Sequence, residues 1–141
     1  MFKIQAREID HLVLRVIDVD KMERFYCEVL GLSVAKRNRA LDIVHLRTGR
    51  SMIDIVPVGG KAGARGGAAP GVEGRNLDHL CLRVEPYDEA AIVAHLNAQG
   101  VKVGEIVDRF GAEGNGRSIY LYDPEGNTVE LKGPSDGKLT G

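Results

Sequence analysis

The chain has 141 residues and a mass of 15.3 kDa, enough for one domain or for two small modules that share a core. Nineteen Lys and Arg residues almost balance 20 Asp and Glu residues, which gives no support for binding to nucleic acid or to an anionic membrane. The sequence shows no signal-peptide pattern and no spanning apolar run, and Cys27 and Cys81 form no CxxC motif. We therefore expect a cytoplasmic protein.

The predicted elements occur twice along the chain. The strand-like motif IDHLVLRV at residues 9–16 returns as LDHLCLRV at residues 77–84, with six of the eight positions identical. A helical spacing of apolar residues follows each copy, over 22–30 in the first half and 90–96 in the second, and Gly31 and Gly100 mark the helix ends. Strand-like runs then follow at 32–36, 41–47 and 52–58, and at 101–107, 118–122 and 128–132.

Each half therefore has the pattern β-α-β-β-β, which predicts an α+β fold made of two tandem modules. We expect the first module over residues 1–58, a Gly-rich linker over 59–76, the second module over 77–133 and a tail over 134–141. The alternative for the Gly-rich stretch is a flexible lid that folds over a ligand. Thr48-Gly49 predicts a hairpin turn in the first half, and DPEGN at 123–127 predicts a turn in the second. The Gly-rich stretch 110–116 is expected to be a loop.

Strand alternation places histidine and carboxylate side chains away from the helix-packed face. In the first strand Leu12 and Leu14 point to one face, while His11 and Arg15 point to the other. The same alternation applies to His79 in the second copy. Two acidic residues, Asp54 and Glu130, stand between aliphatic neighbours in the last strand of each half.

Two imidazoles and two carboxylates suit a divalent transition metal, Zn, Ni, Co, Mn or Fe(II), better than Ca or Mg. A single strand histidine or a single strand carboxylate is more often structural. The recurrence of both residue types in both halves favours a metal site. Asp10 and Asp78, which precede the histidines, are expected to serve in turns or caps.

The sequence resembles the vicinal oxygen chelate superfamily, which includes glyoxalase I, extradiol dioxygenases and bleomycin resistance proteins. The similarity is carried by IDHLVLRV, by FYCEVLGLSV at 25–34 and by YLYDPEGNTVEL at 120–131. It implies two βαβββ modules that form a curved, eight-stranded mixed sheet with the helices on its outer face. It also implies metal ligation by His11, His79 and Glu130, with Asp54 at the fourth ligand position.

Asp54 departs from the usual Glu or Gln at that position. Without it, the other three ligands form a two-His, one-carboxylate triad. The resemblance implies a glyoxalase I-like lyase or isomerase for a small substrate, including thiol conjugates, that chelates the metal through vicinal oxygens. Glu130, or secondly Asp54, would carry the proton. Arg15 would either contact a substrate carboxylate or be a solvated arginine at the end of its strand. A homodimer is expected.

Three alternatives stay open. An Fe(II) extradiol-type dioxygenase would use the triad and Tyr120, while His45 either lines the pocket or is an ordinary strand residue. A fosfomycin-type thiol transferase fits the length, although the tail lacks an arginine for a phosphonate. A non-catalytic antibiotic-binding protein is the alternative of another class, and it is disfavoured by the retained metal residues and by an aromatic content of 5%.

Overall fold

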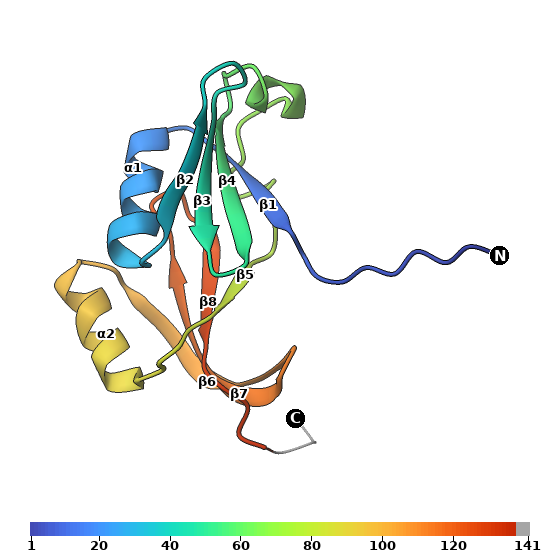
Figure 1. The fold of residues 1–141 in the computed structure, drawn as a ribbon. Coiled ribbons are helices and arrows are strands. Elements are labelled where there is room, and N and C mark those ends of the chain that lie inside the picture. Colours follow the sequence, from blue (N-terminus) through green and yellow to red (C-terminus); the bar gives the residue numbers. More distant parts are fainter. Residues whose placement is uncertain (138–141) are drawn as a thin grey trace. The chain divides into compact units, whose positions relative to one another are not determined.

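The computed structural model describes residues 1–137, so residues 138–141 of the expected tail lie outside the described part. The chain divides into two compact units, Met1–Gly74 and Arg75–Gly141. Each unit has one four-stranded mixed sheet and one α-helix (Figure 1). No helix within residues 1–137 has both the length and the apolar character needed to cross a membrane.

The first unit follows the predicted element order. Its elements are β1 (His11–Val16), α1 (Val19–Arg24), the π-helix η1 (Phe25–Val29), β2 (Ser33–Asn38), β3 (Ile43–Thr48), β4 (Ser51–Pro57) and the 3₁₀-helix η2 (Gly63–Gly66). The strand order is β1-β4-β3-β2, with β1 parallel to β4 and the other pairs antiparallel. The helix begins three residues before its predicted start because the carboxylate of Asp18 accepts the Lys21 N–H at 3.0 Å and caps it.

The core of the first unit lies between its sheet and its helical segment. Leu14 on β1 and Ile55 on β4 are fully buried, as are Met22 and Tyr26 from the helical segment. Val13, on the opposite face of β1, is 47% exposed. The predicted alternation of this strand is therefore confirmed.

The second unit repeats this arrangement with a longer hairpin, formed by its second and third strands. Its elements are β5 (Leu80–Arg83), α2 (Glu89–Ala98), β6 (Val103–Gly111), β7 (Gly114–Tyr122) and β8 (Thr128–Lys132), in the sheet order β5-β8-β7-β6. Leu96, Ile119, Leu121 and Val129 form the buried core. Because β5 begins only at Leu80, His79 lies just before the strand rather than within it.

The prediction of a loop over residues 110–116 is wrong, because these residues belong to the long β6–β7 hairpin. Their glycines permit close contacts within the fold. A Cβ at Gly116 would lie 2.3 Å from the carbonyl oxygen of Pro134, and a Cβ at Gly111 would lie 2.6 Å from Cε of Lys132. Glycine here reflects crowding around an extended strand, which composition alone does not separate from loop flexibility.

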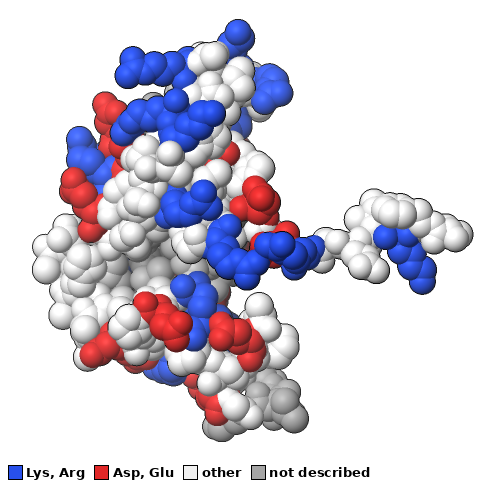
Figure 2. Space-filling model, viewed as in Figure 1, with Lys and Arg blue, Asp and Glu red and all other residues white. Residues whose placement is uncertain are grey.

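The two units differ in charge. Lys and Arg outnumber Asp and Glu by 12 to 9 in the first unit, whereas the second has 7 basic and 11 acidic residues. Figure 2 shows basic and acidic side chains interspersed over the surface of the first unit. The formal net charge is therefore +3 for the first unit and −4 for the second.

Candidate functional site

Glu130 is the centre of the polar cluster in the second unit. It lies on β8 between Cys81 of β5 and Tyr120 of β7, and the residue is 4% exposed. Ser118 donates its hydroxyl to Oε2 at 2.6 Å, and Tyr120 donates its hydroxyl to Oε1 at 2.9 Å. Nε2 of His79 lies 3.3 Å from the same Oε1 atom. The carboxylate is therefore held by neighbours from β7 and faces the candidate ligand His79.

Burial and hydrogen bonding act in opposite directions on Glu130. Burial by itself raises the pKa of the carboxyl group, but the hydrogen bonds from Ser118, Tyr120 and Cys81, together with the charge interaction with His79, outweigh it, and the net pKa is lowered. Glu130 is therefore a carboxylate at neutral pH, the form that binds a cation or accepts a proton. The phenol of Tyr120 has a raised pKa, mainly through burial and also through its hydrogen bond to Glu130, so it remains a donor.

A cavity of about 260 Å³ opens beside this cluster, within the second unit. One wall is formed by the tip of the β6–β7 hairpin, and the remainder by β5 and β8. The lining residues are His79, Cys81, Arg83, Phe110, Gly111, Ala112, Glu113, Glu130, Lys132 and Gly133. A concave site with a few converging polar groups is the usual form of a small-molecule site.

In the first unit, the predicted ligand Asp54 is paired with His45. Asp54 is 5% exposed on β4, and its Oδ1 lies 2.8 Å from Nδ1 of His45 on β3. The two residues are directly opposite each other across the β3–β4 hairpin. This pair was not predicted. A two-residue turn at Thr48-Gly49 would place His45 opposite Met52, whereas the strands pair Thr48 with Ser51 and the turn lies one residue later.

Each candidate metal-binding histidine is held by the aspartate that precedes it. Nδ1 of His11 lies 2.7 Å from Oδ1 of Asp10, and Nδ1 of His79 lies 2.6 Å from Oδ2 of Asp78. The hydrogen bond that His11 donates to the Asp10 carboxylate is the main cause of the raised pKa of His11. The expectation of a turn or cap role for these aspartates is therefore wrong. The signal was present in the Asp-His dipeptide, which both motif copies share.

This arrangement orients the histidines for a metal. A carboxylate bound to Nδ1 fixes the ring and leaves Nε2 as the ligand atom. The second unit thus offers His79 Nε2 and the Glu130 carboxylate as neighbouring donors. The first offers His11 and Asp54, of which Asp54 is already engaged by His45. These donor types fit a divalent transition metal, although within residues 1–137 no three His, Cys, Asp or Glu side chains form a ready-made ligand cluster.

Arg15, predicted to contact a substrate, is bound to the Gly-rich segment. Its guanidinium donates to the carbonyl oxygens of Gly63 at 2.9 Å, Gly66 at 3.2 Å, Gly67 at 2.6 Å and Ala68 at 3.0 Å. The segment predicted as a plain linker therefore has a local structure that includes η2. A contact between Arg15 and a substrate remains a prediction.

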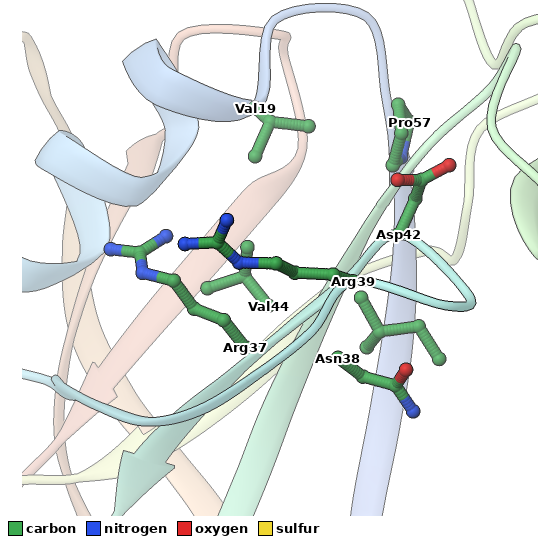
Figure 3. A pocket seen from close by; sticks show the side chains of 8 residues that line it. Val19, Arg37, Asn38, Arg39, Asp42, Val44 and Pro57 are labelled. Atoms are coloured by element: carbon green, nitrogen blue, oxygen red, sulfur yellow. The ribbon is translucent and has the colours of Figure 1, made fainter.

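A second cavity, of about 200 Å³, lies in the first unit beside the ends of β2 and β3. Figure 3 shows the side chains of Arg37 and Arg39 extending in the same direction along it, past Val44. Arg37 forms two hydrogen bonds with the carboxylate of Glu23, at 2.9 and 2.5 Å. One of the two cations is therefore already neutralised, and none of the predicted site residues lines this cavity.

The comparisons with known proteins agree with the fold and the motifs. The model of the Glyoxalase/Bleomycin resistance protein/Dioxygenase superfamily matches residues 8–131. The chain is 32% identical over 129 residues to virulence protein STM3117 of Salmonella typhimurium, a match that covers 87% of this chain and 81% of that protein. The crystal structure of that protein superposes with a TM-score of 0.78 and 28% identity, covering 93% of this chain and 99% of that one.

Two further relatives extend the comparison. The glyoxalase domain-containing protein RDO1 of Mycosarcoma maydis is 32% identical over 139 residues, which is 96% of this chain and 73% of that protein. A lactoylglutathione lyase from Agrobacterium tumefaciens is similar in fold alone, with a TM-score of 0.65, 23% identity, and coverage of 91% of this chain and 94% of that one. The superfamily includes enzymes, and its members often bind metals and small molecules. The chain belongs to the Glyoxalase/Bleomycin resistance protein/Dioxygenase superfamily.

Proposed function

We propose that the protein is a metal-dependent, glyoxalase I-like lyase or isomerase whose small substrate chelates the metal through vicinal oxygens. His11, His79 and Glu130 would hold the metal, with Asp54 as the fourth candidate ligand. The observation that carries this proposal is the duplicated Asp–His pair, because an aspartate at Nδ1 orients each imidazole with Nε2 as the candidate ligand atom. The buried carboxylate of Glu130 beside His79 supplies the negative charge that a divalent cation requires.

The chemistry divides between the metal and the protein. A bound divalent metal supplies Lewis-acid stabilisation for the negative charge that develops on the substrate oxygens. Glu130 accepts the proton from the substrate carbon and returns it to the neighbouring carbon. Ser118 and Tyr120 fix the orientation of the carboxylate, so the proton leaves and returns along a defined path. Asp54 is the second candidate for the same role.

The decisive experiment combines metal binding with turnover. The chelator-stripped protein is titrated with Ni, Zn, Co, Mn and Fe(II), and binding is followed by calorimetry and by the midpoint of thermal unfolding. Turnover of the adduct of methylglyoxal with a thiol is then measured for each metal form. We expect a rise in unfolding temperature and turnover with at least one metal.

The matched variants are His79→Ala and His95→Ala. His79 is a candidate ligand, whereas His95 is an exposed residue of α2 outside the cavity. The proposal is supported if His79→Ala loses metal affinity and His95→Ala keeps it. Asp78→Ala should reduce metal affinity by about 10- to 100-fold if the aspartate orients the ring.

Each opposing result has a clear meaning. Absence of both metal binding and turnover would exclude the enzymatic proposal in favour of a metal-free binding protein. If the protein binds Fe(II) and consumes oxygen when a catechol is added, it is a dioxygenase and the lyase proposal is wrong.

A further inference from the structure

Lys132 is a buried cation beside the candidate site. It is the last residue of β8, and it lies on the same face of the strand as Glu130. The residue is only 6% exposed. Its Nζ donates to the carbonyl oxygen of Gly116 at 3.2 Å and to that of Arg109.

The charge of this lysine is only partly compensated. Among the residues that the structure describes, no carboxylate lies within ion-pair distance of its Nζ. An ammonium group has three N–H donors, and the two carbonyl oxygens account for two of them. Burial of an unpaired charge is unfavourable, which makes such lysines rare in protein interiors. An anion that pairs with this group would therefore bind favourably.

The position of Lys132 is suited to a ligand of the candidate site. Lys132, His79 and Glu130 line the same cavity. Residues two apart on a strand are separated by roughly 6.7 Å, so a small molecule near Glu130 can also reach Lys132. The glycine at position 111 leaves room for the lysine chain, since a Cβ there would lie 2.6 Å from Lys132 Cε.

We propose that Lys132 binds an anionic group of the substrate, so that the substrate class is a small carboxylic acid with vicinal oxygens. The vicinal-oxygen part of this statement rests on the proposed function. The carboxylate part rests on the burial, the hydrogen bonds and the cavity position of Lys132. Such a ligand places its carboxylate at Lys132 and its oxygen pair at the end of the cavity that contains His79 and Glu130.

The test uses two probes that differ by one carboxylate, 3,4-dihydroxybenzoate and catechol. Their dissociation constants are measured by calorimetry on the metal-loaded wild-type protein. A charge-assisted hydrogen bond in a buried site predicts that the acid binds about 10- to 100-fold more tightly than catechol. Raising the ionic strength should reduce this ratio only slightly, because a buried ion pair is little screened.

Variants then assign the effect to the lysine. Lys132→Met should bring the ratio of the two dissociation constants close to one. Lys132→Arg should keep most of the preference for the acid over catechol. Lys102→Met is the matched control, because Lys102 is exposed and outside the cavity, and it should leave the ratio unchanged. If Lys132→Met fails to fold, Lys132→Gln, which keeps a hydrogen-bond donor without the charge, takes its place and should also bring the ratio close to one.

The outcomes separate this inference from the proposed function. A wild-type ratio near one, or a high ratio that Lys132→Met leaves unchanged, overturns the role of Lys132. If the protein binds no metal, the same comparison is made with benzoate and phenol. A preference for benzoate that requires Lys132 would then support the anion site although the metal proposal has failed.

Discussion

Replacement of Arg15 by methionine tests whether this arginine organises the Gly-rich segment or binds a substrate. In the structure its guanidinium donates to four backbone carbonyl oxygens of residues 63–68. A hydrogen bond that involves a charged group contributes about 1.5–3 kcal/mol when it is protected from water. Only the bond to Gly63 is partly buried, and the other three lie at the exposed surface where water competes, so we expect a total loss of about 2–3 kcal/mol.

Such a loss should appear first as local opening of the segment. It corresponds to an increase of about 30- to 150-fold in the population of the open form. The part of the segment that Arg15 holds contains Arg65 and is preceded by Lys61, and trypsin cleavage after these two residues under native conditions reports that population. Cleavage after these residues should accelerate by the same factor in Arg15→Met.

Two further variants sharpen the test. Arg47→Met removes an exposed arginine from β3 and should leave cleavage unchanged. Gly66→Ala should also accelerate cleavage, because a Cβ at this position would lie 2.3 Å from Nε of Arg15 and would displace the guanidinium. Unchanged cleavage in Arg15→Met, together with a raised KM for the substrate, would refute this reasoning and support substrate contact instead.

Three other predictions concern stability. Leu14→Ala should cost about 2–5 kcal/mol in the free energy of unfolding, measured with urea, whereas Val13→Ala on the opposite face of β1 should cost much less. Asp123→Ala should cost about 2–4 kcal/mol in the same assay, because this buried carboxylate accepts three hydrogen bonds within its turn. The hydrogen bond from Arg37 lowers the pKa of Glu23, so this pair stabilises the protein above the unfolded-state pKa and its contribution disappears as the pH falls through the lower folded-state pKa. The loss of stability between pH 7 and pH 3 should therefore be smaller in Arg37→Met than in the wild type; an equal loss would contradict the assignment.

The sequence predicted those features of the fold that depend on local periodicity. The repeated strand motif gave the order of the elements in both units, and alternation placed His11 and Leu14 on opposite faces of β1 correctly. The capped start of α1 was missed because the apolar spacing begins only at Met22, whereas the helix begins at Val19, directly after its polar cap Asp18.

The contacts within the candidate site were harder to predict from the sequence, because they are made between residues of different strands. The pairing of His45 with Asp54 depends on the exact register of β3 and β4, which alternation alone does not define. The burial of Lys132 depends on two carbonyl groups of the β6–β7 hairpin, whose residues 110–116 composition had indicated as a loop. Glycine content predicted flexibility at positions where the fold uses glycine for close packing.

The β6–β7 hairpin is longer than the β2–β3 hairpin, and its additional residues line the cavity without contributing to the core. Strands β2 and β3 have six residues each, whereas β6 and β7 have nine, and the additional residues carry Phe110 and Glu113 to the rim of the cavity. Glu113 is bound there by Arg83 at 2.6 Å. Evolution can therefore enlarge or narrow the ligand entrance through this tip while the central carboxylate and the apolar interior stay untouched.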